Sequence, residues 1–98
     1  MRYAELYKVS PTVMTNVMNC ENKELNPLLQ SYVKNSSGPN GREDSWGLVQ
    51  IHKPSWPQFT HEEITDPDFA INFMAKQMSE GNSKIWTCYR MLYPSKGG

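Results

Sequence analysis

Apolar residues recur at helical spacing in two long segments, which together carry most of the predicted fold. The first segment begins at Ser10 and Pro11, a favourable N-cap followed by a proline that the first turn of a helix tolerates. Its apolar face is formed by Val13, Met14, Val17 and Met18. Because residues three and four apart share one face, the segment is predicted to be an amphipathic helix that ends near Lys23 or Glu24.

The second helical segment begins at Asp66 and Pro67 and repeats the same kind of start signal. Its apolar stripe consists of Phe69, Ala70, Phe73, Met74 and Met78. Gly81 is expected to stop this helix, since glycine commonly follows a helix end. The stripe is typical of an ordinary core-forming helix.

Three shorter helices are predicted from weaker patterns. Residues 2–9 place Tyr3, Leu6 and Tyr7 on one side of a short helix. Thr60 and Glu63 have the spacing of a capping box, with room for only one turn after them. A last helix is expected from Asn82, with an apolar face of Ile85, Trp86, Tyr89 and Leu92.

The middle of the chain has no helical pattern. Residues 34–44 are almost wholly polar and contain glycine and proline, which predicts either a two-stranded excursion or a mobile loop. The run Trp46–Ile51 is too short to classify, and the prolines of 52–59 favour an extended surface segment. The expected fold class is α+β, mainly α, with four to five short helices and at most one small β-hairpin. It forms a single domain, 1–98, with a frayed tail at 94–98.

Composition excludes several classes of function. Ten Lys and Arg balance ten Asp and Glu in 98 residues, so a nucleic-acid partner is not expected. No apolar run is long enough for membrane insertion. No signal peptide is recognisable, which leaves removal of a targeting segment or another export route. His52 and His61 form no ligand pattern with the cysteines, so neither a metal nor another cofactor is expected.

The two cysteines, Cys20 and Cys88, are able to pair. Closing so long a loop would contribute about 4 kcal/mol on chain-entropy grounds, which is a useful gain for a small core. Two buried thiols in a reducing compartment are the alternative. We predict the bridge, because it would join the first long helix to the last one.

Glu21 lies four residues after Val17 and three after Met18, so its carboxylate is expected on the apolar face of the first long helix. Burial disfavours the charged form of a carboxyl group and raises its pKa. Carboxyl groups of this kind serve as general acids on glycosidic oxygens. A solvated glutamate at a frayed helix end is the alternative.

Five segments resemble, in this order, the lysozyme-like superfamily and within it the lytic transglycosylases, over residues 3–92. They are YKVSPTVMTNVMNCEN, LNP, GREDSWGLVQI, TDPDFAINFMAKQM and GNSKIWTCYR. The family pattern is an acid at a helix end, an Asn-Pro, a Gly-Leu-x-Gln-Ile segment, an Asp-Pro helix, and a Gly-Asn followed by a tyrosine. Each motif is weak alone, whereas the five in order are specific.

The resemblance implies a lysozyme-like fold in which Glu21 is the catalytic acid of a cleft. It implies that the cleft floor is formed by Gly47, Leu48, Gln50 and Ile51. The expected substrate-binding residues are Ser45, Gln50, Ile51, Trp86 and Tyr89, with Tyr89 near the acid. Trp46 and Trp56 are further candidates for stacking on sugar rings, although a core position is commoner for tryptophan.

The implied function is cleavage of the MurNAc–GlcNAc bond in peptidoglycan glycan strands by one glutamate, used first as general acid and then as base. An extracellular, periplasmic or phage-particle-associated monomer is expected. Lysozyme-type hydrolysis of the same bond and a catalytically inactive structural or binding module are alternatives. A helical partner-binding domain with an accidental resemblance is the third.

Two departures concern the acid itself. Asn22 stands where serine usually follows the acid in this family. The gap from the acid to Asn26-Pro27 is one residue longer than usual, which makes Glu24 a rival acid. Glu21 is preferred because the apolar stripe leads to it and Glu24 is nearer the expected helix end.

A third departure concerns a second carboxylate. Ser45 occupies the position where animal-type lysozymes carry an aspartate, and Glu43 and Asp44 come just before it. The favoured interpretation is that these two acids pair with Arg42 or cap the following turn. Orientation of a water molecule for hydrolysis is the alternative.

Overall fold

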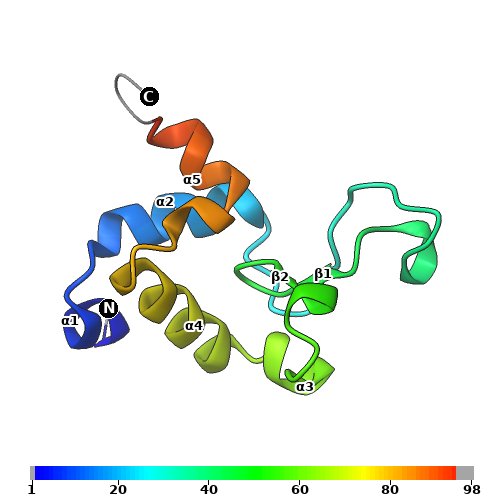
Figure 1. The fold of residues 1–98 in the computed structure, drawn as a ribbon, viewed down its shortest axis with the longest axis horizontal. Helices are drawn as coiled ribbons and strands as arrows, with labels where there is room; N and C mark the ends of the chain where they lie inside the picture. The colour runs from blue at the N-terminus through cyan, green and yellow to red at the C-terminus, as the bar shows by residue number, and fades with distance from the viewer. Residues whose placement is uncertain (1, 95–98) are drawn as a thin grey trace.

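A computed structural model describes residues 2–94. The helices are α1 (Arg2–Tyr7), α2 (Pro11–Glu21), α3 (His61–Ile64), α4 (Pro67–Ser79) and α5 (Thr87–Leu92), with 3-10 turns η1 (Pro39–Gly41), η2 (Lys53–Ser55) and η3 (Ser83–Ile85). One two-stranded antiparallel sheet joins β1 (Ser45–Trp46) to β2 (Ile51–His52). Five helices and one small hairpin confirm the predicted α+β, mainly α class (Figure 1).

Three of the predicted helix starts are confirmed by their caps. The hydroxyl of Ser10 accepts a hydrogen bond from the N–H of Val13, and the carboxylate of Asp66 accepts one from Phe69. Thr60 and Glu63 form a complete capping box at α3. These starts are predictable because a cap is satisfied within three residues of its own chain.

α2 ends at Glu21, two to three residues earlier than predicted. Asn22 leaves helical geometry, and its buried side chain bonds to the backbone of Asn26 and Gly47 instead. Glu21 is therefore the last residue of the helix, which places its side chain where the helix meets the hairpin.

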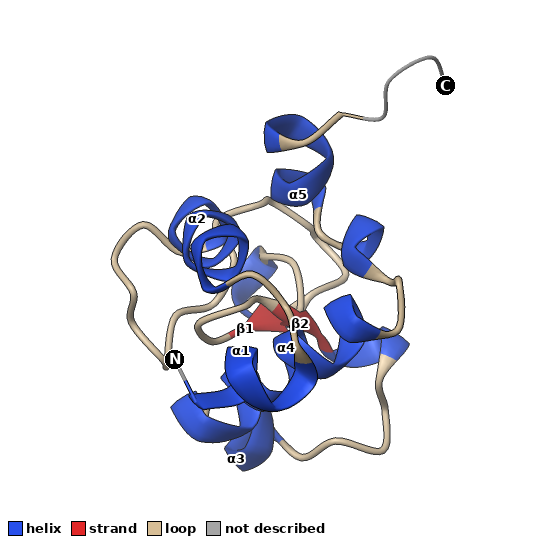
Figure 2. Cartoon of the chain, turned by 90° about the vertical axis from the view of Figure 1, so that its left-hand side faces the viewer, coloured by secondary structure: helices blue, strands red, loops and turns tan. Residues whose placement is uncertain are grey.

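The core lies where α2, α4 and the β-hairpin meet (Figure 2). Its fully buried apolar side chains include Met14, Val17, Val49, Ile64 and Met74. Ala4 is the buried residue of α1, whereas Leu6, predicted on the inner side, is 66% exposed. Tyr3 and Tyr7 do face α4, because their hydroxyls donate to Asp68 and Asn72.

The hairpin turns sharply at Gly47. Its φ of 87° is a left-handed conformation that L side chains rarely adopt, and a Cβ atom there would collide with the carbonyl oxygen of Ile64. Across the strands, Ser45 pairs with His52 and Trp46 with Ile51. Glycine at 47 thus allows the hairpin to press against α3.

Residues 30–44, called here the excursion, form a loop whose two arms are joined by isolated bridges rather than by regular strands. Isolated antiparallel bridges join Gln30 to Trp46 and Lys34 to Arg42, and the excursion extends away from the helices in Figure 1. The buried Gln30 amide donates to the carbonyl of Pro39 and accepts from the Asn40 side chain. The side chain of Gln30 therefore holds the turn of the excursion against its base through hydrogen bonds.

Two expectations along the chain are wrong. Residues 53–55 form the turn η2 rather than an extended segment. The last helix is interrupted at Trp86, whose backbone is extended (φ −91°, ψ 121°) and whose buried indole N–H donates to the carbonyl of Val49 at 2.8 Å. Because this tertiary contact overrides the helical pattern, Ile85 and Leu92 remain exposed.

No helix within residues 2–94 has both the length and the apolar character needed to cross a membrane. Of the predicted frayed tail, residues 95–98 lie outside the described part of the chain.

Candidate active site

A cavity of about 880 Å³ lies between the end of α2, the excursion, the hairpin and residues 85–88. Its volume is within the range of ordinary small-molecule sites. Two carboxylates, Glu21 and Glu43, lie in its wall, and none of its lining residues, all within 2–94, is Lys or Arg. The cavity is therefore an acidic site with apolar and amide-bearing walls.

Glu21 is the half-buried acid of this cavity. Burial raises the pKa of its carboxyl group, while the hydrogen bond from the N–H of Cys88, at 3.1 Å to Oε1, lowers it. The nearby carboxylate of Glu43 raises the pKa further, and the guanidinium of Arg90 lowers it. The net direction is upward, which agrees with the expectation from the apolar helix face.

Glu43 is the second carboxylate of the cavity. The hydroxyl of the buried Ser45 donates to Glu43 Oε1 at 2.7 Å, and the N–H of Glu43 donates to the carbonyl of Val33. Both contacts fix the position of Glu43 beside Glu21 in the cavity wall. The sequence alone did not distinguish Glu43 from Asp44, because the path of the excursion decides which of the two lines the cavity.

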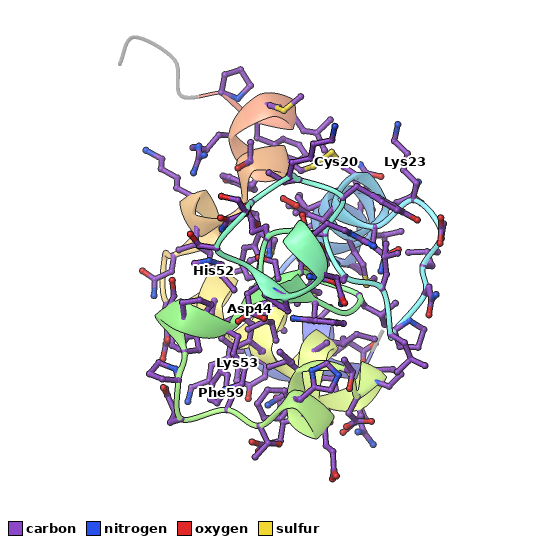
Figure 3. All side chains as sticks on the ribbon, turned by 90° about the vertical axis from the view of Figure 1, so that its right-hand side faces the viewer. Cys20, Lys23, Asp44, His52, Lys53 and Phe59 are labelled. Carbon is purple, nitrogen blue, oxygen red and sulfur yellow. A yellow bond between two sulfur atoms is a disulfide. The ribbon has the colours of Figure 1, made fainter. Side chains whose placement is uncertain are left out.

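Asp44 has a structural role instead. Its Oδ1 accepts a hydrogen bond from the indole N–H of Trp46 at 2.6 Å, and its carbonyl accepts one from Lys53. The predicted pairing of Glu43 and Asp44 with Arg42 is wrong, because the Arg42 guanidinium donates to the carbonyls of Gln30 and Ser31. Figure 3 shows Asp44 close to Lys53 and His52 on the hairpin face of the molecule.

The expected cleft floor is present only in part. Gln50 and Ile51 line the cavity, together with Ser45. Gly47 is turned toward Ile64, and Leu48 is buried in the core. The amide nitrogen of Gln50 donates to the carbonyls of Leu29 and Gly47, so its carboxamide oxygen is the group left to meet a ligand.

The aromatic residues divide between cavity and core. Trp56 and Trp86 line the cavity, as does Tyr32, which the sequence analysis missed because a lone tyrosine in a polar segment carries no positional signal. Trp46 does not line it, since its ring packs edge-on against His61. Tyr89 also lies outside the lining, where it packs against Tyr93 with ring centroids 5.4 Å apart.

The predicted disulfide between Cys20 and Cys88 is confirmed, with Cα atoms 6.0 Å apart. Cys88 lines the cavity directly. Glu24, the rival acid, lies outside the lining and is exposed, where it accepts a hydrogen bond from the hydroxyl of Tyr32 at 2.7 Å. Glu21 is therefore the glutamate of this helix end that faces the cavity.

Two further polar residues, His52 and Ser55, also line the cavity. His52 Nδ1 and Ser55 Oγ are 2.8 Å apart, and both side chains are exposed. Within residues 2–94 no three His, Cys, Asp or Glu side chains are placed to hold a metal ion.

The chain matches no protein-family model, no curated protein and no solved structure. Its function is therefore inferred from the chemistry of the cavity and from the motifs in its sequence.

Proposed function

We propose that this chain cleaves the MurNAc–GlcNAc bond of peptidoglycan glycan strands by the lytic transglycosylase reaction, on a lysozyme-like fold. The observation that carries the proposal is Glu21, half-buried in a cavity wall, with a raised pKa and its carboxylate oriented by a backbone N–H. A raised pKa makes the carboxyl group hold its proton to higher pH, and a proton is what a glycosidic leaving oxygen needs.

In the first step Glu21 donates its proton to the glycosidic oxygen as the bond to C1 of MurNAc breaks. Positive charge develops on the sugar ring, and the N-acetyl oxygen of the same sugar stabilises it. The two carboxylates of the cavity and the absence of Lys and Arg from its lining favour a developing cation electrostatically.

In the second step the ionised Glu21 acts as base. It takes the proton of the C6 hydroxyl of the same MurNAc, whose oxygen then bonds to C1 and closes a 1,6-anhydro ring. Glu21 thereby recovers its proton, and no water is consumed. One glutamate is sufficient for both steps, which suits a cavity in which burial raises the pKa of Glu21.

Substrate binding is assigned to the apolar and amide groups of the wall. Trp56 and Tyr32 contribute aromatic surface for sugar rings, on the faces left by Phe59, which stacks on Trp56, and by the Arg42 guanidinium, which lies over the Tyr32 ring. The Gln50 carboxamide oxygen accepts from a sugar hydroxyl or amide. The indole N–H of Trp86 is already bonded to Val49, so Trp86 contributes apolar surface. The working form is a monomer that meets the cell wall from the extracellular or periplasmic side or from a phage particle.

Hydrolysis of the same bond is the second candidate, and the position of Glu43 favours it. A hydrolase needs a second carboxylate that activates water or attacks C1. Glu43 shares the cavity with Glu21 and is held by Ser45, so it is the residue able to take that role.

Mass spectrometry of the fragments released from purified cell-wall sacculi tests the proposal. The transglycosylase reaction yields 1,6-anhydro ends, each lighter by one water than the reducing ends left by hydrolysis. Reducing ends would establish the Glu43-assisted reaction instead. Binding to sacculi with no released fragments would refute both reactions and identify an inactive binding module.

A further inference from the structure

Each of the two cysteines of the disulfide is directly connected to Glu21. Cys20 directly precedes Glu21 in the chain, and its partner Cys88 supplies the N–H that bonds to Glu21 Oε1. One covalent link thus fixes the carboxylate's own helix and the hydrogen-bond donor that orients it.

Apart from the disulfide, α5 is held by the half-buried Tyr89, which packs against the core, and by the anchored Trp86 that precedes the helix. In α5 (Thr87–Leu92) the buried residue is Cys88 itself, whereas Met91 is 70% and Leu92 47% exposed. Beyond the helix, Tyr93 accepts an exposed hydrogen bond from Asn16. The bonds of the Arg90 guanidinium are local, to Lys84 and Thr87. The disulfide is therefore the one buried side-chain contact of α5 itself, and the other contacts of the helix are half-buried or exposed.

The rest of the core does not depend on α5. The fully buried residues Met14, Val17, Val49, Ile64 and Met74 belong to α2, the hairpin, α3 and α4. Trp86 is anchored independently by its bond to Val49. Opening the disulfide is therefore expected to release α5 while the remaining domain stays folded.

We infer that Cys20 and Cys88 are redox-sensitive positioning residues for Glu21, so that cleavage of glycan strands requires the oxidised protein. This inference rests on the proposed function. An enzyme of this kind is inactive in a reducing compartment and becomes active where its cysteines are oxidised.

The disulfide is open to a reductant at a shallow groove between α2 and the end of α5. This groove is lined by Asn16, Asn19, Cys20, Lys23 and Leu92 (Cys20 and Lys23 are labelled in Figure 3). A dithiol such as dithiothreitol attacks one sulfur as thiolate, and the S–S bond breaks. The dithiol is oxidised to its cyclic disulfide. Its two electrons and two protons pass to the protein, where they convert Cys20 and Cys88 to thiols.

Release of α5 also changes the surroundings of Glu21. The charged groups that act on its carboxylate are Glu43 from the excursion and Arg90 from α5, and His52 and Tyr32 are further titratable residues of the cavity lining. Burial is the largest influence on the pKa of Glu21 and raises it, whereas the Cys88 N–H lowers it. Opening the wall at Cys88 removes both, so the pKa of Glu21 falls toward its ordinary value.

The test measures kcat/KM on purified sacculi, together with the NMR titration of the Glu21 carboxyl, for oxidised and dithiothreitol-reduced protein. We expect a loss of about a hundredfold in kcat/KM on reduction, the size of effect that a misplaced catalytic group produces. The alkaline limb of the pH profile and the Glu21 pKa should both move to lower pH. Reoxidation should restore all three. Cys20→Ser/Cys88→Ser should resemble the reduced protein.

Thr60→Ala is the control for lost stability, because it removes the α3 cap far from the cavity and should leave kcat/KM unchanged below its melting temperature. Full activity or an unmoved Glu21 pKa in reduced, folded protein would overturn the inference. Oxidised protein that is inactive on every glycan, with a Glu21 pKa that still falls on reduction, would refute the proposed function and leave the positioning role standing.

Discussion

The side-chain amide of Asn22 donates a 3.0 Å hydrogen bond to the carbonyl of Gly47 and so joins the end of the acid helix to the turn of the β-hairpin. The same nitrogen donates to the carbonyl of Asn26 at 2.7 Å, and the side-chain oxygen accepts from the Asn26 N–H. One buried residue therefore fixes the helix end, the following loop and the hairpin relative to one another. Glu21 is its neighbour in sequence, so the orientation of the acid depends on this contact.

Asn22→Ala is expected to lower the free energy of unfolding by about 1–2 kcal/mol, because it removes three hydrogen bonds to the backbone of Asn26 and Gly47. It should also lower kcat on sacculi, since the helix end that carries Glu21 is no longer fixed. Asn19→Ala, an exposed position on the same helix, is the control and should be nearly neutral. Denaturant unfolding measures the first effect and fragment release the second.

The start of each long helix was predictable from sequence, and its end was not. Ser10 and Asp66 satisfy N–H groups three residues away, so their role is visible in the local sequence. The end of α2 at Glu21 depends on Asn22 reaching Gly47, twenty-five residues later. The break at Trp86 depends likewise on Val49, a contact that no helical pattern reveals.

The candidate site, too, was predicted only in part. Glu21, Ser45, Gln50, Ile51 and Trp86 do meet at one cavity. Tyr89 was expected there from the family pattern, but its helix starts one residue after Trp86, so the ring turns toward Tyr93. The presence of Glu43 follows from the path of the excursion, which Gln30 and Gly38 determine through tertiary contacts.

Glu43→Gln separates the two candidate reactions. If the chain is a transglycosylase, the variant should keep most of its rate, because Glu21 performs both proton transfers. The pKa of Glu21 should fall in this variant, since a neighbouring negative charge that opposes its ionisation is removed. The alkaline limb of the pH–rate profile should therefore move to lower pH. Asp44→Asn, which keeps the oxygen that accepts from Trp46, is the control; loss of all turnover in Glu43→Gln alone would indicate hydrolysis.

The raised pKa of Glu21 also predicts how stability depends on pH. The folded state holds this proton to higher pH than the unfolded state, whose pKa is near 4.5. Between these two pKa values the folded state binds more protons, so the contribution of Glu21 to the free energy of unfolding falls as pH rises. Glu21→Gln removes this term. The variant should be more stable than wild type near pH 7, and the difference should shrink as the pH falls toward about 4.5 and be lost below it. Urea titrations at pH 7 and below about 4.5 would show this.

Gly38 is expected to be essential for the excursion. A Cβ atom at this position would collide with the carbonyl oxygen of Arg42, which belongs to backbone and cannot move aside cheaply. Gly38→Ala should disrupt the turn and displace Glu43, visible as lost amide-exchange protection over residues 30–44. Gly41→Ala, in the same turn but with open space around it, should cost only the strain of a positive φ, about 1–2 kcal/mol.

The rate at which Glu21→Gln releases soluble fragments from purified sacculi tests the central claim most directly. The amide is nearly isosteric with the carboxyl group, so the fold should be kept, while the proton that the leaving oxygen needs is gone. We expect turnover to fall by several orders of magnitude, and Glu24→Gln, at the exposed glutamate outside the cavity, to retain it. Near wild-type release by Glu21→Gln, with Glu24→Gln inactive, would contradict the assignment of the catalytic acid.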